Sequence, residues 1–432
     1  MICENVSVRA DGQLLFAKQN TAALAATYGT PLYLMDEDRI RERCRTYLSA
    51  VKTAFDGKGC VLYASKAASF KHIYTIMNEE GMCIDVVSPG EIATALRAGF
   101  PMERVYYHSG HKSDDDIAYA LSAGVGCFIV DTIEELLALE RLTAAANRRQ
   151  RIVLRLTPGI DPHTYEAVAT GKVDSKFGFA IETGAADEAV QAALAQPHLQ
   201  LEGFHCHVGS QVFDSDVFLR SAEIMLDYMY SVRERFGYTA AFLDLGGGYG
   251  VRYREDDATL DIAENIAQVG AYVKEKAAAL RYPMPKIAFE PGRSIVADAG
   301  MTLYTVSSFK KIAGYKNYVM VDGGMTDNPR FALYGAPYTV VAASKMHEPC
   351  TVDCTVAGRC CESGDIIQEH VQMPASIKRG DLVACLTTGA YNYSMASNYN
   401  RVPRPPVVML KGGESFVAVR RETLDDIVAL DR

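Results

Sequence analysis

The sequence predicts an α/β barrel of eight parallel strands, of the (β/α)8 type, followed by a separate domain built of β-strands. Between about residues 58 and 290, eight short apolar segments alternate with helical patterns. Residues capable of chemistry stand at or just after the C-terminal ends of these segments, where such barrels build their active sites. After Glu290, strand-like segments follow one another with few helices between them. A doubly wound open sheet is the alternative fold for the first part.

The expected barrel strands are short, rich in β-branched or aromatic residues, and bounded by polar residues or glycine. They are Cys60–Tyr63, Cys83–Val87, Val105–His108, Cys127–Val130, Ile152–Leu156, Gly203–His207, Phe242–Leu245 and Ile287–Glu290. Helices are expected between them at Pro89–Ala98, Ser113–Ala123, Thr132–Asn147, Asp214–Phe236 and Asp261–Leu280. Ser88 is a candidate N-cap of the first helix, and glycines follow the first two helices.

A second domain of β-strands is expected after the barrel. Its strand-like segments are Met301–Phe309, Tyr318–Val321, Tyr338–Val341, Thr351–Val356, Leu382–Leu386, Val407–Leu410 and Phe416–Val419. Short strand-like pieces near the N-terminus are expected to join it. We therefore predict a barrel over residues 30–285 and a β-domain formed by residues 1–29 together with 286–432.

The composition excludes several functional classes. The chain has 432 residues, of which 49% are hydrophobic and 22% charged, and its formal net charge of -9 would repel a nucleic acid. No apolar run reaches the ~20 residues that cross a bilayer, and Met1–Gly12 has no apolar signal core. Eleven scattered cysteines, an odd number, favour free thiols in a reducing compartment. We expect a cytoplasmic protein without a membrane or nucleic-acid partner.

Four cysteines close together, Cys350, Cys354, Cys360 and Cys361, raise the alternative of a zinc site. Their spacing lacks the C-x2-C pairs of many structural zinc sites, and two of the four are adjacent. We therefore expect no metal ion.

Several residues that suit catalysis share a position at the predicted strand ends. They are Lys66, Asp85, His108, Arg155, His207, Gly246–Gly248 and Glu290. An ordinary polar loop is the better explanation for any one of them, but it is a weaker explanation for the whole set. In a closed barrel all of them would meet at one mouth.

Lys66 follows the first strand in the segment YASKA. Burial at a barrel mouth lowers the pKa of a lysine and makes its amine a nucleophile toward an aldehyde. A Schiff-base role is therefore one hypothesis, and a solvated surface charge is the other.

Gly246, Gly247 and Gly248 follow the seventh strand. Backbone N–H groups of successive glycines can surround a phosphate, although three glycines also suit a tight turn. The dinucleotide fingerprint is not met, because residue 251 is Val rather than Gly. No G-x4-G-K-[ST] loop occurs, which argues against a P-loop NTPase.

The last barrel strand continues into the segment EPGR, which begins at Glu290 and ends at Arg293. A carboxylate facing a pyridine nitrogen would keep that nitrogen protonated, and an arginine binds phosphate or carboxylate in bidentate fashion. A surface Glu–Arg pair is the alternative. His205 and His207 alternate as on one strand face, so a metal ligand, a ring stacked on a cofactor and a buried structural histidine all stay open.

Seven segments, in this order, resemble the diaminopimelate decarboxylases, a family within the barrel-type pyridoxal-phosphate decarboxylases that also include ornithine and arginine decarboxylases. The segments are YASKA, HVGSQ, LGGG, EPGR, the run Asp327–Ala336, CESGD and GAYNYSMASNYN. Each is weak alone, but together they span most of the chain. The resemblance implies a TIM-like, alanine-racemase-like barrel with a C-terminal β-domain, and pyridoxal 5'-phosphate as the cofactor.

The resemblance also implies roles for individual residues around the cofactor. Lys66 would hold the cofactor covalently, His207 would stack on its ring, and Glu290 would face the ring nitrogen. The expected cofactor-binding residues are Lys66, Asp85, His207, Ser210, Gly247, Gly248, Glu290, Gly292, Arg293 and Tyr391.

The implied substrate site uses residues from the second half of the chain. Its expected members are Arg293, Arg330, Tyr334, Glu362 and Tyr391. The two arginines and Tyr334 would bind the carboxylate that is not removed, and Glu362 would meet the ammonium at the same end. Cys361 would return a proton to the carbanion. In this family Cys361 and Glu362 come from the partner subunit, which implies a homodimer with shared active sites.

The implied reaction is the decarboxylation of meso-2,6-diaminopimelate to L-lysine and CO2, the last step of lysine biosynthesis. The alternatives are a decarboxylase of ornithine, lysine or arginine, a racemase on the same barrel, and an inactive regulatory relative. A second substrate carboxylate would explain Arg293 and Arg330, whereas Glu290 argues against a racemase. Lys66 and Cys361 are both present, which argues against an inactive relative.

Three positions depart from the family pattern. They are Ala68 and His111, where the family often has asparagine, and Phe331, where proline is common. None of them carries an assigned chemical role, although His111 lies near the expected barrel mouth.

Overall fold

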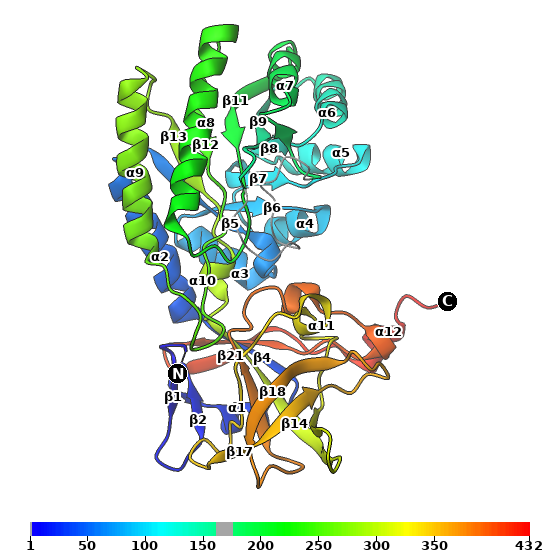
Figure 1. Cartoon of the computed structure of the whole chain (residues 1–432). Helices are drawn as coiled ribbons and strands as arrows, with labels where there is room; N and C mark the ends of the chain where they lie inside the picture. The colour runs from blue at the N-terminus through cyan, green and yellow to red at the C-terminus, as the bar shows by residue number, and fades with distance from the viewer. Residues whose placement is uncertain (1, 161–175) are drawn as a thin grey trace. The chain divides into compact units, whose positions relative to one another are not determined.

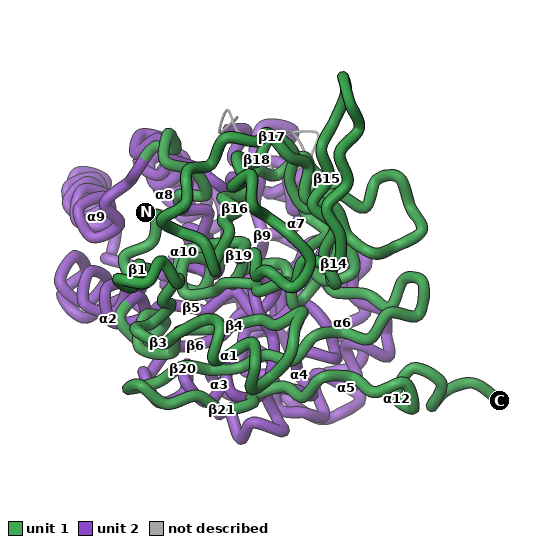
Figure 2. The backbone as a smooth tube through the Cα atoms, turned by 90° about the horizontal axis from the view of Figure 1, so that it is seen from below, with its two compact units in different colours: residues 1–42, 251–258, 293–432 green, residues 43–250, 259–292 purple. Residues whose placement is uncertain are grey.

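The computed structural model of the protein describes residues 2–160 and 176–432, and its internal contacts divide the chain into two units (Figure 2). The barrel unit comprises Arg43–Gly250 and Thr259–Gly292. The β-unit comprises Met1–Glu42, Val251–Ala258 and Arg293–Arg432.

The barrel unit contains a closed ring of eight parallel strands (Figure 1). In order around the ring they are β5 (Gly59–Ala64), β6 (Cys83–Val86), β7 (Val105–His108), β8 (Cys127–Val130), β9 (Gln150–Thr157), β11 (Leu199–His205), β12 (Phe242–Asp244) and β13 (Lys286–Phe289). The ring closes because the last strand pairs with the first, with Ile287 opposite Gly59. The predicted (β/α)8 barrel is therefore confirmed, and the doubly wound alternative is excluded.

The sixth strand ends earlier than the pattern predicted, at His205 rather than His207. Cys206 still donates its N–H to the Asp244 carbonyl over 2.9 Å, after which the chain leaves the ring. Val212 then donates its N–H to the Gly248 carbonyl, also over 2.9 Å. His207 thus lies on a loop that pairs with the glycine segment, and it does not share a strand face with His205.

Helices alternate with the barrel strands along the chain. The predicted ones are confirmed as α4 (Pro89–Arg97), α5 (Asp114–Ala123), α6 (Ile133–Ala145), α8 (Ser215–Phe236) and α9 (Ile262–Ala279); α2 (Glu37–Ala54), α3 (Lys71–Glu79) and α7 (Ala185–Leu194) are further helices. Ser88 caps α4 as predicted, its side chain accepting the Glu91 N–H. Figure 1 shows α8 and α9 side by side, where they pack against each other.

Apolar side chains from the strands form a core cluster in the barrel unit. They include Leu62, Tyr106, Cys127, Ile129, Val153, Phe242 and Ala288. The rings of Tyr106 and Phe242 stack with their centroids 5.8 Å apart. The polar residues at the strand ends lie at the carboxyl-terminal end of the barrel, where such folds build their active sites.

The β-unit is organised around one sheet in the order β18-β17-β15-β14-β4-β20-β21, with β19 paired to β14 and to β16. The bounds are β4 (Leu32–Asp36), β14 (Gly300–Lys311), β15 (Asn317–Val321), β16 (Val340–Val341), β17 (Cys350–Ala357), β18 (Ile366–Pro374), β19 (Leu382–Leu386), β20 (Val407–Lys411) and β21 (Glu414–Val419). A separate small sheet holds β1 (Val6–Val8), β2 (Leu14–Phe16) and β3 (Gln19–Asn20). The predicted separate domain of β-strands is confirmed, and β4 and β18 are strands beyond those predicted.

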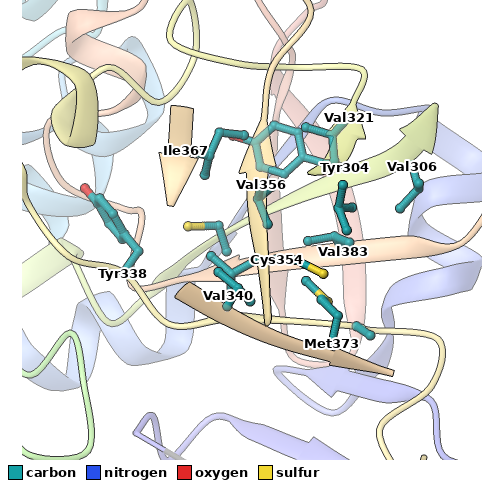
Figure 3. Packing of buried hydrophobic residues seen from close by; sticks show 14 of the residues in the cluster. Tyr304, Val306, Val321, Tyr338, Val340, Cys354, Val356, Ile367, Met373 and Val383 are labelled. Carbon is teal, nitrogen blue, oxygen red and sulfur yellow. The ribbon is translucent and has the colours of Figure 1, made fainter. Parts of the chain in front are cut away.

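Figure 3 shows the core of the β-unit, in which Tyr304, Val356, Ile367 and Met373 pack together. Cys354 lies in this core, so its thiol acts as a small apolar group. Within residues 2–160 and 176–432, no helix is both long enough and apolar enough to cross a bilayer.

Candidate active site

Lys66 lies in a single 3-10 turn, Ser65–Ala67, directly after β5. The turn is tied to the end of β13, because the Ala64 N–H donates to the Pro291 carbonyl over 3.0 Å. Gly292 packs against the same place: a β-carbon on it would lie 2.9 Å from that of Ala64, closer than real side chains approach. The predicted nucleophile and the turn after Glu290 are therefore neighbours at the carboxyl end of the barrel.

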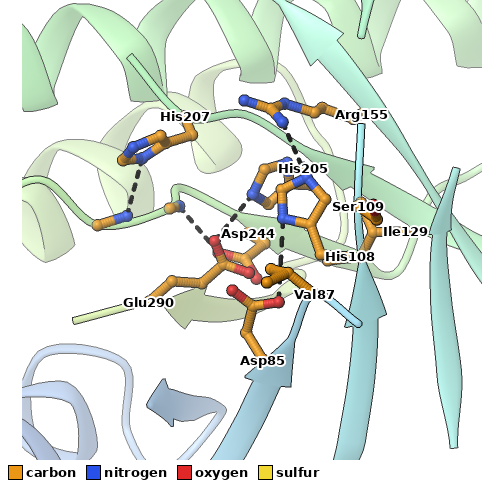
Figure 4. Close-up of polar contacts among 12 residues, drawn as sticks. Asp85, Val87, His108, Ser109, Ile129, Arg155, His205, His207, Asp244 and Glu290 are labelled. Atoms are coloured by element: carbon orange, nitrogen blue, oxygen red, sulfur yellow. Dashed lines mark hydrogen bonds and ion pairs between the residues drawn. The ribbon is translucent and has the colours of Figure 1, made fainter. Parts of the chain in front are cut away.

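Strands β6, β7 and β9 bring Asp85, His108 and Arg155 together (Figure 4). Arg155 Nη1 donates to His108 Nε2 over 2.9 Å, and His108 Nδ1 lies 4.0 Å from Asp85 Oδ1. Asp131, directly after β8, lies 3.9 Å from Arg155 Nε. All four side chains are buried, so the carboxyl ends of four adjacent strands contribute to one polar group.

A second buried group surrounds Glu290 (Figure 4). His205 Nε2 lies 3.0 Å from Glu290 Oε2. Asp244, at the end of β12, shares a side-chain hydrogen bond with Glu290, which requires that one of the two carboxyls is protonated. Asp244 Oδ1 also accepts the Gly246 N–H over 2.8 Å, which joins this group to the glycine segment.

The buried acids of this site hold protons more tightly than exposed ones. Burial raises the pKa of Asp85 and Asp244 well above their usual range, and the Glu290 charge raises both further. Burial also raises the pKa of Glu290, but Lys66, Arg155 and the hydrogen bond with Asp244 lower it. Of the Glu290–Asp244 pair, Asp244 is therefore the acid that holds a proton more tightly.

The histidines of the site are neutral. Burial lowers the pKa of His108, His205 and His207 well below the usual value, and the cations Lys66 and Arg155 lower it further. Because an arginine only donates, His108 Nε2 must be the acceptor, and the proton of this ring sits on Nδ1, on the side of Asp85.

The glycine segment has no room for side chains. A β-carbon at Gly247 would lie 2.1 Å from the Glu290 carbonyl oxygen, and one at Gly248 would lie 2.3 Å from the Gly209 carbonyl oxygen. Gly248 also has a φ of 113°, which favours glycine. His207 Nδ1 accepts the Gly247 N–H over 3.4 Å, so the predicted stacking histidine is fixed to this segment.

These features fit the predicted cofactor. A backbone of glycines that excludes β-carbons, paired with the loop that carries Ser210, suits a phosphate. Glu290 is buried, and no N–H of the described residues donates to its Oε1, which suits a protonated pyridine nitrogen. Lys66, only partly buried, lies close enough to lower the pKa of Glu290.

His108, His205 and Glu290 also bring metal-ligand atoms within 4.8 Å of one another, the one such group in the described part of the chain. Arg155 donates to His108, and Arg155 and Lys66 both lower the pKa of His205, so the local field opposes a further cation. The four neighbouring cysteines do not gather, because Cys354 lies in the β-unit core while Cys350 and Cys361 are exposed.

In the β-unit, the predicted carboxylate-binding residues collect around Tyr391. The guanidinium carbons of Arg293 and Arg330 lie 4.7 and 5.3 Å from the centre of its ring, and Arg330 lies 5.7 Å from the Tyr334 ring. Arg293 Nη1 donates to the Tyr253 hydroxyl over 2.7 Å. Both arginines are buried, so two guanidiniums beside one ring make a strong anion-binding group.

Cys361 and Glu362 lie in the loop between β17 and β18, and both are exposed. Asn400 Oδ1 accepts the Cys361 N–H over 2.8 Å, and the buried Asp365 accepts the Cys360 N–H over 2.6 Å. The backbone of this loop is thus fixed while the thiol and the carboxylate stay accessible.

Three residues of these groups received no functional role in the sequence analysis. Asp131 and Asp244 lie at strand ends, so the rule that selected Asp85 and Glu290 would have found them if applied to every strand. Tyr253 offers no such signal, because it lies outside the barrel motifs and its partner Arg293 is 40 residues away.

Known proteins resemble this chain over its full length. A family model described as pyridoxal-dependent decarboxylase, pyridoxal binding domain, matches residues 37–297. The diaminopimelate decarboxylase of Bacillus subtilis is 44% identical over 420 residues, covering 97% of this chain and 95% of the relative. That of Staphylococcus aureus is 39% identical over 426 residues, covering 99% of each. The solved structure of diaminopimelate decarboxylase from M. jannaschii in complex with L-lysine has a TM-score of 0.92 at 30% identity, covering 100% of this chain and 98% of that one.

Proposed function

The chain belongs to the pyridoxal-dependent decarboxylases and, among them, to the diaminopimelate decarboxylases, and on this basis we propose that it converts meso-2,6-diaminopimelate to L-lysine and CO2. This is the last step of lysine biosynthesis. The observation that carries the proposal is the position of Lys66 at the carboxyl end of a closed barrel. A backbone hydrogen bond joins its turn to the turn that follows the buried Glu290. Pyridoxal 5'-phosphate, when bound, supplies an electron sink for the electron pair that CO2 leaves behind.

Most of the barrel residues predicted to bind the cofactor have a proposed role in holding it, while Asp85 is proposed only as a further member of the set. Lys66 would hold the cofactor covalently through its Nζ amine. Glu290 would keep the ring nitrogen protonated, and His207 would stack on the ring. Ser210 and the glycine segment bind the phosphate through N–H and hydroxyl donors, and Gly292 lets the turn come close.

Phosphate and substrate contacts are also proposed for the β-unit. Arg293 and Tyr391 belong to both sets, and Arg330 and Tyr334 bind the carboxylate that stays on the product. Support comes from the buried pair of guanidiniums around Tyr391, which matches the charge of a second carboxylate. A substrate such as ornithine has no carboxylate at that end, so this group favours diaminopimelate.

Reprotonation is assigned to Cys361, and recognition of the distal ammonium to Glu362. Both are exposed on the β17–β18 loop, which supports a role in a neighbouring subunit. We therefore propose a homodimer in which each active site takes these two residues from the partner subunit. All eleven cysteines are free thiols, which supports a reducing, cytoplasmic location.

Product identification tests the function directly. Purified protein with pyridoxal phosphate is offered meso-diaminopimelate, ornithine, arginine and lysine in competition, and the products are identified by mass spectrometry. Lysine with CO2 as the only products is the expected result. Putrescine, agmatine or cadaverine instead would contradict the substrate assignment of Arg293 and Arg330. The assignment of a pyridoxal-phosphate decarboxylase would be retained.

A further inference from the structure

His205 contacts the carboxylate that we propose to face the ring nitrogen. Its Nε2 lies 3.0 Å from Glu290 Oε2, and the exposed fractions of the two residues are 0% and 6% (Figure 4). His205 ends β11 and Glu290 follows β13, so the contact passes over the intervening strand, β12. That strand supplies Asp244, the second neighbour of Glu290.

The position of the proton in this contact follows from the surrounding charges. Burial, Arg155 and Lys66 lower the pKa of His205, so the imidazole is neutral and carries one proton. Asp244 holds a proton more tightly than Glu290, and a Glu290 that binds a protonated ring nitrogen is ionised. A neutral ring beside an ionised carboxylate has one favourable arrangement, in which Nε2–H donates to Oε2.

A second histidine holds the His205 ring in this orientation. The ring centroids of His108 and His205 lie 4.7 Å apart with the planes at 69°, and Arg155 donates to the far side of His108. The other nitrogen of His205, Nδ1, is buried and has no hydrogen-bond partner among the described residues. The contact with His108 therefore holds the His205 ring so that Nε2, its only nitrogen with a hydrogen bond, points to Glu290.

We propose that His205 is a positioning residue that fixes Glu290, through its Nε2–H, in the ionised form and the orientation needed to bind the protonated ring nitrogen of pyridoxal phosphate. The proposal rests on the proposed function. A carboxylate with a fixed donor on Oε2 keeps Oε1 directed at its ligand, as an outer donor directs a metal-bound carboxylate. His205 therefore affects the cofactor through the ring nitrogen without touching it.

The test measures cofactor affinity rather than turnover. Full-length protein is stripped of cofactor and titrated with pyridoxal 5'-phosphate or with its 1-deaza analogue, which has carbon in place of the ring nitrogen. We expect His205→Leu to weaken binding of pyridoxal phosphate by about 10- to 100-fold, the loss of one hydrogen bond to a charged group, and to change binding of the analogue less than about twofold. His205→Gln, whose side-chain N–H can reach Glu290, should keep most of the affinity.

Glu290→Gln is the matched control, because it should also lose affinity for pyridoxal phosphate and not for the analogue. Equal losses for both cofactors in His205→Leu would assign the histidine a structural role and overturn the proposal, as would equal losses in the Leu and Gln variants. If His205→Leu does not fold in a thermal unfolding scan, His205→Asn replaces it, because the shorter amide cannot reach Glu290. Failure of the proposed function is distinguishable. A chain that does not use pyridoxal phosphate would bind neither compound as wild type, and a chain with another amino-acid substrate would give another product in the competition assay while its cofactor binding stays as described.

Discussion

The Ala64 N–H donates to the Pro291 carbonyl over 3.0 Å, which joins the turn that carries Lys66 to the turn that follows Glu290. The bond links the first and last strands of the barrel at the end where the polar residues collect. Because it uses backbone atoms only, replacing the Lys66 side chain leaves both turns in place. Variants at Lys66 therefore test chemistry rather than folding.

Lys66→Ala should abolish the visible absorbance of the imine that links lysine and cofactor, because this link requires the lysine amine. The absorbance spectrum after reconstitution with pyridoxal phosphate measures this. Lys71→Ala, at an exposed lysine five residues further on, is the control and should keep the wild-type spectrum. An unchanged spectrum in Lys66→Ala would exclude Lys66 as the attachment point.

Cys361→Ala should reduce turnover of meso-diaminopimelate by about 10²-fold or more if the thiol is the general acid, with cofactor absorbance intact. Steady-state kcat and the spectrum of the same preparation are the two measurements. Cys350→Ala removes another exposed thiol of the same unit and should leave kcat unchanged. Normal turnover in Cys361→Ala would remove this residue from the mechanism.

Arg330→Leu should lower kcat/KM for meso-diaminopimelate by about 10²-fold or more, because one of two buried guanidiniums around Tyr391 is lost. The spectrum of bound cofactor should not change, since Arg330 is assigned to the substrate alone. Arg379→Leu, at an exposed arginine of the same unit, is the matched control. A kcat/KM equal to wild type would place the distal carboxylate elsewhere.

Shared active sites predict complementation between inactive subunits. Lys66→Ala and Cys361→Ala proteins should each have little activity, but a mixture that exchanges subunits should recover up to about a quarter of wild-type activity, because half of the dimers are mixed and each has one intact site. Activity is measured after dilution, mixing and reassembly. A mixture that forms mixed dimers without gaining activity would show that each site is built from one chain.

Asp327 predicts a pH dependence of stability. Burial raises the pKa of its carboxyl to about 7, although the Tyr304 hydroxyl and the Gly324 N–H donate to it. The folded pKa exceeds the unfolded value of about 4, so the stabilisation is complete below pH ~4 and is lost as pH rises through about 7. Relative to Asp327→Asn, the wild-type free energy of unfolding should fall by up to roughly 4 kcal/mol over that range. Urea unfolding at a series of pH values measures it, and a constant difference would contradict the assignment.

Position in the chain explains which site residues could be predicted. Lys66, Asp85 and Glu290 each lie at a strand end, and the alternation of strands and helices was enough to order those strands around a ring. The contact between His205 and Glu290 could not be predicted, because the two residues are 85 positions apart and the sequence left three roles open for the histidine.

The unpredicted strand β18 has a local explanation. Its register with β17 shifts three times, and His370 within it has a φ of 55°. Such bulges turn successive side chains out of strict alternation, so the segment Ile366–Pro374 lacks the two-residue period by which strands are recognised. The next strand in the sequence, β19, has a continuous apolar run and was predicted.

Closure of the ring has a consequence for biosynthesis. β5 ends at Ala64, but the strand that covers its free edge begins at Lys286, so a nascent chain exposes that edge until residue 286 has left the ribosome. Pairing of β4 is completed even later in synthesis, because one of its partner strands is β20, which ends at Lys411. Unpaired edges of this kind invite aggregation and engage chaperones. The yield of active protein should therefore depend on chaperone capacity during translation. Lys66 is synthesised early, but the strand and turn beside it, from Lys286 onward, are synthesised more than 200 residues later.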